Sequence, residues 1–306
     1  MQFVVRRLSF SVITILGVAF IVVSLTKLLP GDPARVIAGV QADQVEVERI
    51  RAALRLDDGL LQQYVHFISN LIQGNLGTSA RTARPVTEEI VSRLPYTIEL
   101  ATVAVVVGTI LGAMLGVTAA VYHRRWPDLV ASSIAVLTIS VPGFWLALML
   151  ILTLSVDLRW FPTGGAESAS AIVLPAATLA TFTAGLVARM TRAAMLDVLR
   201  QDYVRTGYAK GLRHWVVVYK HALRNAAIPI VTVIGLQLGA LMGGAIIVET
   251  VFSWPGIGRL LIQSITARDF PMMQGIVFIF AAVVVVVNLL TDLVYAVIDP
   301  RIVLND

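Results

Sequence analysis

The side chains that could carry out chemistry are few in this sequence, and their spacing builds no known reactive site. The absence of cysteine excludes disulfides, thiolate zinc sites and a cysteine nucleophile. The four histidines (His66, His123, His214 and His221) are scattered, without an H-E-x-x-H or similar metal-ligand spacing. None of the three lysines stands in a P-loop, and no G-x-S-x-G elbow occurs. We therefore expect no catalytic residue, no metal and no cofactor bound by this chain.

Polar and helix-breaking residues inside apolar runs are either structural features of the helices or marks of a pathway or moving segment. Asp292 lies about two turns before the end of the last apolar run, with Asn288 one turn earlier on the same face. An intramembrane carboxylate is costly and usually faces a cavity or a partner, the alternative being a structural hydrogen bond to a neighbouring helix. Pro142, followed by Gly143, predicts a kink that is either static or part of a moving segment. No further ionisable residues at depth accompany Asp292, which argues against a proton-driven carrier.

Composition places these residues in a membrane protein. Of the 306 residues, 57% are hydrophobic and 14% are charged, whereas about 25% are charged in a soluble domain. The net charge of +5 could indicate nucleic-acid binding, but the distribution of the basic residues fits a membrane protein better, so we expect no nucleic acid. The apolar run that follows Arg6 and Arg7 is longer than the roughly 7–15 residues of a signal-peptide core, and we interpret it as a retained first span.

Six segments are apolar enough and long enough to cross a bilayer: Leu8–Leu29, Ile98–Val121, Leu129–Val156, Ala171–Val187, Ile228–Val248 and Gly275–Ile298. The fourth is the shortest, and if it were re-entrant every later segment would change sides. With the N-terminus inside, thirteen Lys and Arg residues fall on the inside and three in the two short outside loops. We therefore expect an all-α membrane protein with six transmembrane helices, both termini cytoplasmic, in contact with the lipid bilayer.

Two polar parts interrupt the spans. The external part, 30–97, is predicted to be a small subdomain between helices 1 and 2 with amphipathic helices at Val45–Leu56 and Leu60–Gln73. The cytoplasmic loop, 191–227, is too long and too patterned for a mere connector. The predicted divisions are the N-terminus and first helix at 1–29, the external subdomain at 30–97, a five-helix core at 98–298 that includes the loop, and a cytoplasmic tail at 299–306.

The cytoplasmic loop has the pattern of a helix, a glycine and a second helix. Leu196–Lys210 predicts an amphipathic helix, Gly211 breaks it, and a second helix follows from about His214 to Asn225. Such a knob suits docking in a groove of another protein, and the alternative is a basic segment resting on anionic lipid.

Glycines at a spacing of four mark one face of two spans: Gly108, Gly112 and Gly116 in the second, and Gly235, Gly239 and Gly243 in the fifth. They indicate close helix packing within the chain or, alternatively, packing that slides during gating.

Several motifs in order along the chain resemble one family. The loop contains Asp202-Tyr203-Val204-Arg205-Thr206, Ala209-Lys210-Gly211-Leu212 and His221-Ala222-Leu223-Arg224-Asn225, which resemble the coupling loop of bacterial ABC importer permeases of the DppB/OppB type. Further similarities are Leu29-Pro30-Gly31-Asp32-Pro33, Gly74–Ser79, Arg93–Thr97, Glu249–Gly258 and Asp299-Pro300-Arg301. Gly207 stands where this family usually has Ala, and Arg55 and Gly59 stand where it tends to have Gly and Pro.

The resemblance implies a type I ABC importer permease of a dipeptide, oligopeptide or nickel transporter, working by alternating access in the bacterial inner membrane. The implied partners are a homologous DppC/OppC-like permease, two cytoplasmic ATPase subunits that bind ATP and Mg, and an external substrate-binding protein. The implied ATPase-coupling residues are Asp202, Tyr203, Arg205, Thr206, Gly207, Ala209, Lys210, Gly211, His221, Arg224 and Asn225. Pro142, Gln237, Asn288 and Asp292 are candidates for the pathway or gate.

Two other classes of function remain to be compared with this one. A self-contained channel or secondary carrier would transport alone, but repeated broken helices and intramembrane charge pairs are missing from the sequence. A structural or sensory anchor would leave the loop motifs unexplained. The substrate stays open among dipeptides, oligopeptides, glutathione, nickel chelates and opines, because in the family selectivity rests largely with the binding protein.

Overall fold

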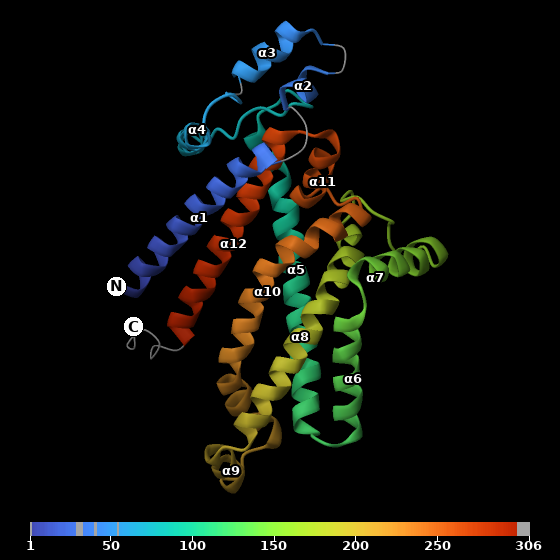
Figure 1. Cartoon of the computed structure of the whole chain (residues 1–306). Helices are drawn as coiled ribbons and strands as arrows, with labels where there is room; N and C mark the ends of the chain where they lie inside the picture. Colours follow the sequence, from blue (N-terminus) through green and yellow to red (C-terminus); the bar gives the residue numbers. More distant parts are fainter. Residues whose placement is uncertain (1, 29–32, 40–41, 54, 299–306) are drawn as a thin grey trace. The chain divides into compact units, whose positions relative to one another are not determined.

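The computed structural model describes residues 2–28, 33–39, 42–53 and 55–298, and the regular elements in these ranges are helices, with one isolated bridge between Thr78 and Pro85 (Figure 1). The described residues form two compact units. The first comprises Met1–Thr97 and Pro255–Leu289, and the second comprises Ile98–Trp254 and the residues from Leu290 onward. The motifs at 29–32 and 299–301 and the tail at 299–306 lie outside the described residues.

The first unit contains the predicted external segment. Its helices are α1 (Gln2–Leu28), α2 (Pro33–Ala38), α3 (Gln44–Ala53), α4 (Leu60–Ile72), the start of α5 (Val86–Val121), α11 (Ile257–Ala267) and most of α12 (Phe270–Ile298). The two predicted amphipathic helices are confirmed as α3 and α4. Arg55, just beyond α3, has a φ of 52°, in the left-handed region that glycine adopts most easily. This conformation would suit the glycine that the resemblance implies at this position.

Asp269, between α11 and α12, joins parts of the first unit that are distant in sequence. Its buried carboxylate accepts hydrogen bonds from the Ser79 hydroxyl at 2.5 Å and from the backbone N–H groups of Ala80 and Arg81 at 3.1 and 3.3 Å. It also accepts one from the N–H of Met272 at 3.2 Å, in the first turn of α12. One carboxylate therefore holds the segment before α5 against the start of α12.

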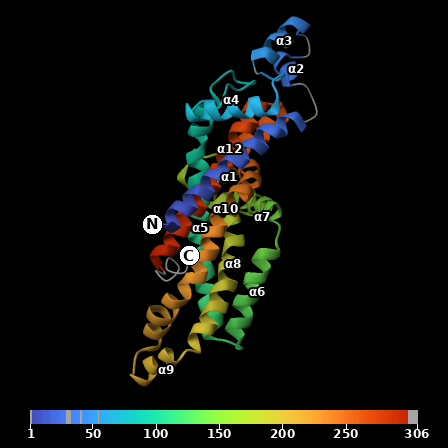
Figure 2. The same cartoon turned by 60° about the vertical axis from the view of Figure 1, so that its left-hand side comes forward.

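The second unit contains the rest of α5, then α6 (Trp126–Ser140), α7 (Gly143–Leu150) with the π-helix η1 (Ile151–Asp157), the 3-10 helix η2 (Ala169–Ile172), α8 (Val173–Leu199), α9 (Asp202–Ala209), the π-helix η3 (Val216–Ala222) and α10 (Leu223–Val251). Helix α8 packs against both α6 and α10, which flank it in both views, and α9 lies at one end of this group (Figure 1, Figure 2). Helix α8 is therefore the centre of the unit.

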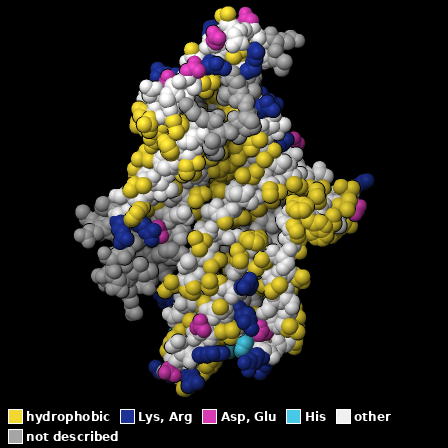
Figure 3. Space-filling view, in the orientation of Figure 1, with side chains coloured by type: hydrophobic (Ala, Val, Ile, Leu, Met, Phe, Trp, Pro, Cys, Tyr) yellow, Lys and Arg dark blue, Asp and Glu magenta, His cyan; other side chains and the backbone are white. Residues whose placement is uncertain are grey.

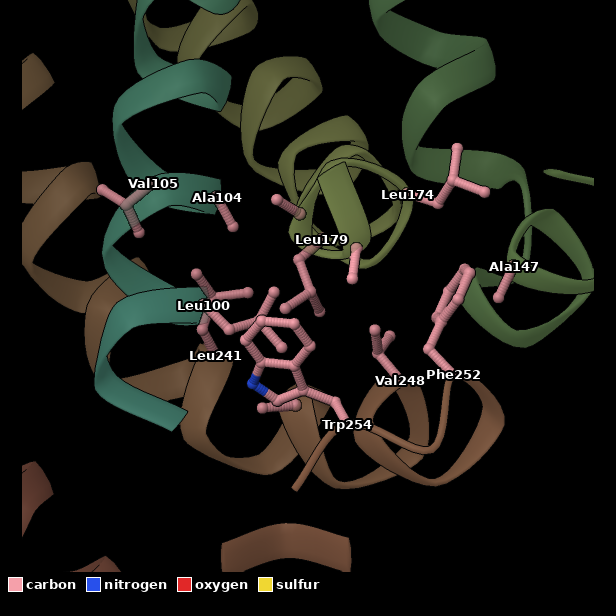
Figure 4. Close-up of a cluster of buried hydrophobic side chains, with 13 residues drawn as sticks. Leu100, Ala104, Val105, Ala147, Leu174, Leu179, Leu241, Val248, Phe252 and Trp254 are labelled. Carbon is pink, nitrogen blue, oxygen red and sulfur yellow. The ribbon is translucent and has the colours of Figure 1, made fainter. Parts of the chain in front are cut away.

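Two apolar clusters hold the second unit together. Figure 4 shows the first, in which Leu100 and Ala104 of α5, Leu179 of α8 and Leu241 of α10 surround Trp254. The second lies toward α9 and joins α5, α8, η3 and α10 through Val117, Val187, Met195, Val218 and Ile230. The charged side chains gather mainly at that end of the unit, while apolar side chains cover much of the surface elsewhere, including α7 (Figure 3). Such an apolar exterior is what a bilayer requires.

The structure has nearly as many spanning helices as the six predicted, but several predicted boundaries are wrong. Among the described residues, five helices are long and apolar enough to span, or six if α6 and α7–η1 count as one span. The predicted kink at Pro142 is confirmed, but it is a bend of 99°, so Leu129–Val156 is wrong as a single helix. The fourth segment, predicted as Ala171–Val187, runs as a helix from Ala169 to Leu199. Its last three turns stay helical because Ala194 and Met195 are buried in the second cluster.

The glycine face of α5 packs directly on α8. A methyl group added at Gly112 would lie 2.6 Å from the carbonyl oxygen of Ala184, and one at Gly116 would lie 2.5 Å from Cβ of Thr191. These approaches are closer than any real side chain allows, so the first trio serves helix packing within this chain. Gly243 of the second trio is different, because an added methyl group there would meet no described atom within 4 Å.

An ion pair between the buried Asp128 and the partly exposed Arg192 connects the start of α6 to α8. The carboxylate of Asp128 accepts hydrogen bonds from Nε and a terminal nitrogen of Arg192 at 2.7 and 2.9 Å. It also accepts from the N–H of Arg124 at 2.9 Å and from the hydroxyl of Ser132 at 3.1 Å. Nδ1 of His123 lies 3.2 Å from the same carboxylate. All the hydrogen-bonding capacity of this carboxylate is used to fix the turn on α8.

Candidate functional site

The loop after α8 contains the coupling residues that the resemblance implies, and its first helix differs from the prediction. Leu196–Lys210 is wrong as one helix, because α8 ends at Leu199 and α9 begins at Asp202. The backbone at Gln201 is extended, with φ −73° and ψ 149°. The break lets α9 turn onto η3, and Val204 of α9 is buried. The loop is therefore a folded knob rather than an extension of a span.

The turn of the knob is made by Gly211, as the sequence predicted. Its φ is 75°, in the left-handed region, and the backbone N–H groups of Lys210 and Gly211 donate to the carbonyls of Thr206 and Tyr208 at 3.0 and 2.9 Å. These bonds satisfy the carbonyls at the end of α9. A methyl group added at Gly207 would lie 3.6 Å from Val217, an ordinary contact, so the alanine that the family usually has would fit here.

The second helix of the knob begins at His214, as predicted, but does not end at Asn225. It passes through the π-helix η3 into α10 and continues to Val251. Asn225 donates one hydrogen bond to the Tyr203 hydroxyl and one to the carbonyl of His221, both at 2.9 Å. The end of α9 that is far from Gly211 is therefore tied to the base of the long helix.

The predicted coupling residues lie together in this knob and most of them are exposed. Gly207 and His221 are half-buried, and the exposed members are Asp202, Tyr203, Arg205, Thr206, Ala209, Lys210, Gly211, Arg224 and Asn225. Aromatic residues that the sequence reasoning did not select join them, notably Trp215 and Tyr219, which are 59% and 57% exposed. Exposed aromatic and basic side chains at one place are typical of a protein interface.

The pathway candidates separate into two groups. A cavity of about 270 Å³ in the second unit is lined from α6, α7, α8 and α10 by Gln237 and by Val141 and Gly143, the residues on either side of Pro142. Asp292, which is half-buried, is not among its lining residues, and Asn288 is exposed on α12. The structure therefore joins Gln237 with the break at Pro142. Because the two residues are far apart in the sequence, no local pattern predicts that they lie at the same cavity. A polar residue inside an apolar span does, however, identify Gln237 as a candidate.

Comparisons with known proteins agree with this architecture. Residues 83–304 match the family described as binding-protein-dependent transport system inner membrane component, and residues 1–101 match its N-terminal family. The chain belongs to this family of importer permeases. It is 46% identical over 302 residues to the glutathione transport system permease protein GsiC of Escherichia coli O6:H1, with 99% of both chains covered. It is 45% identical to the protein of the same name from Salmonella typhi, also over 99% of both chains.

Solved structures support the fold. A structure titled as inward-facing conformations of the MetNI methionine ABC transporter aligns with a TM-score of 0.57 and 19% identity, covering 69% of this chain and 96% of that one. An amino acid ABC transporter crystallised with histidines aligns with a TM-score of 0.53 and 21% identity, covering 70% and 94%. The predicted resemblance and helical fold class are confirmed, while the side of the membrane on which the termini lie stays a prediction: this is a type I ABC importer permease, with helices as the regular elements of its described residues, and a membrane-spanning subunit of the bacterial inner membrane.

Proposed function

We propose that this chain forms half of the translocation pathway of an importer for di- or oligopeptides or related small solutes. A homologous DppC/OppC-like permease would form the other half, two cytoplasmic ATPase subunits would bind ATP and Mg, and an external protein would deliver the substrate. The observation that carries the proposal is the exposed knob formed by α9 and the start of η3. ATP-driven closure of the ATPases would move this knob, and the paired permeases would open alternately to the two sides of the membrane.

The substrate class is proposed from the relatives. Two of them are named as glutathione permeases and are similar to this chain over nearly its whole length. Glutathione is a small peptide, which favours peptides over nickel chelates or opines as the solutes to test first. The separate binding protein, and not this chain, would choose among peptides.

The mechanism also requires the knob to face the cytoplasm, the side on which the distribution of Lys and Arg places both termini. The chain has no cysteine, so single cysteines report their own side of the membrane. In intact cells, a membrane-impermeant maleimide should label a cysteine at Thr163, in the predicted outside loop, and should leave one at Ala209 unlabelled until the cells are opened. Labelling of Ala209→Cys from outside would reverse the orientation and remove the basis for ATPase docking.

A mild-detergent pull-down of the tagged chain from native membranes, with mass spectrometry, tests the assembly. We expect an ATPase and a second permease to be recovered together with the chain. Replacing Arg205 by Glu and Gly211 by Val should abolish recovery of the ATPase while the second permease stays, because the knob loses an exposed cation and its left-handed turn.

Gly207→Ala is the matched control, since it changes the same helix at a position with room for the methyl group. It should retain the ATPase. If the chain is recovered alone, and the double substitution changes nothing, the importer assembly is rejected and a self-contained carrier becomes the leading alternative.

A further inference from the structure

We infer that the cavity beside Gln237 is a contact site for the transported solute, and that it recognises the peptide group rather than a charge. This inference rests on the proposed function and adds to it the chemistry by which this chain would read its cargo.

Gln237 is the first observation. Its side chain is buried, with 5% exposed, and it lines the cavity between α6, α8 and α10. Its amide makes no hydrogen bond with any residue that the structure describes. Its polar atoms are not among the fully enclosed atoms without a partner, so the amide faces the space of the cavity, and an occupant without hydrogen-bonding groups would leave it unsatisfied. The amide therefore calls for an occupant that both donates and accepts hydrogen bonds.

The break at Pro142 adds backbone groups beside the same cavity. Proline has no N–H, so the carbonyl of Thr138 lacks the bond that a continuous helix would give it. The N–H groups at the start of α7, those of Gly143 and Phe144, have no acceptor within that helix. Thr138, Gly143 and Phe144 all line the cavity. The sharp bend thus places spare acceptors and donors on the residues that surround Gln237.

The threonine hydroxyl groups that line the cavity already donate their hydrogen bonds to backbone carbonyls. Thr178 and Thr181 of α8 donate to the carbonyls one turn earlier, at 2.9 and 2.7 Å, as does Thr138 to Ala135 at 2.9 Å. They can still accept hydrogen bonds. Gln237 is then the side chain of the cavity that both donates and accepts toward an occupant.

The uncharged and mainly apolar lining restricts the kinds of solute that the cavity can hold. No Asp, Glu, Lys, Arg or His is among the residues that line the cavity, and the remainder are mainly apolar, including Phe144, Phe182 and Leu241. A peptide bond offers one N–H and one carbonyl, which matches one primary amide, and apolar side chains can rest on the apolar walls. A few neutral hydrogen bonds also bind weakly enough for the solute to leave, as a transport pathway requires.

The test uses the whole importer, purified with its partner permease, ATPases and binding protein and reconstituted in vesicles. Gln237→Met keeps the length of the side chain and removes its hydrogen bonds. We expect it to lower the maximal uptake rate of both glutathione and tri-alanine by about five- to thirtyfold, the effect of two lost neutral hydrogen bonds. ATP hydrolysis stimulated by the binding protein should change less than twofold. The control Leu236→Met, at an exposed neighbour outside the cavity, should transport as the wild type does.

Each other outcome has a separate meaning. Wild-type uptake rates for both peptides in Gln237→Met would overturn the inference. Loss of the second permease from this variant would also overturn it, because the amide would then be a contact between the two permeases. An effect on one peptide alone would show that the amide reads something other than the peptide group. If the wild-type importer carries neither peptide, the proposed substrate class itself is rejected, and this inference falls with it.

Discussion

Replacing Arg192 by Met should lower the stability of the chain in detergent by about 2 kcal/mol, more than the other single charge substitutions on α8. The carboxylate of Asp128 is buried and receives two of its hydrogen bonds from Arg192. Removing one partner of a buried ion pair costs roughly 3–5 kcal/mol, because it leaves the other charge uncompensated. We expect less here because Arg192 is partly exposed and Asp128 keeps its bonds to Arg124 and Ser132.

Thermal unfolding followed by the intrinsic fluorescence of the tryptophans measures this effect. Arg189→Met is the matched control, since Arg189 lies one turn earlier on α8, is exposed and forms no ion pair with a described residue; its effect should stay within about 0.5 kcal/mol. Adding Asp128→Asn to Arg192→Met should cost less than the sum of the two single changes. Strict additivity would mean that the pair contributes nothing to the fold.

The second large effect is expected at the contact between α5 and α8, where Gly112→Ala should destabilise the chain by about 2–3 kcal/mol. The added methyl group would lie 2.6 Å from the backbone oxygen of Ala184 and 2.8 Å from Cβ of Val187. Neither neighbour is a flexible side-chain end, so the two helices must separate, and overpacking of this kind typically costs 1–3 kcal/mol.

Gly243→Ala is the same substitution in the other predicted glycine face, at a position with no described atom within reach. It should be neutral or slightly stabilising, because alanine favours a helix over glycine by about 1 kcal/mol. The melting temperature and the yield of monodisperse protein on size-exclusion chromatography compare the two variants. Equal behaviour would show that α5 and α8 are not packed as closely as described.

Local patterns in the sequence predicted most of the fold. Long apolar runs identified the spanning helices, the glycine spacing identified the close face of α5, and Pro142 and Gly211 identified two breaks. Each is a property of neighbouring residues, governed by hydrophobicity, proline or the left-handed preference of glycine. The angle at Pro142 was not predictable, because the packing around α7 determines it.

The errors have a common physical source. Amphipathic periodicity continues in phase through Arg200 and Gln201, so no local signal marks the end of α8. Only the tertiary burial of Val204 explains that break. In the same way, no pattern pairs Asp128 with Arg192 or Asp269 with Ser79, because these partners stand 64 and 190 residues apart. The cavity beside Gln237 depends on such distant contacts too, so the sequence could suggest the residue but not its surroundings.

The helix that starts at the knob and runs unbroken from η3 through α10 has a mechanical consequence. Val216 and Gln237 lie on one rod, with a rise of 1.5 Å per residue that separates them by roughly 30 Å. A tilt of the rod by about 10° around one end would carry the other end roughly 5 Å sideways, more than the length of a hydrogen bond. Force applied at the exposed Trp215 and Tyr219 would then reach Gln237 through the helix itself, without a relay of side chains. Pro229 lies between the two ends and removes one backbone hydrogen bond, so a bend of the helix there would reduce the movement at Gln237.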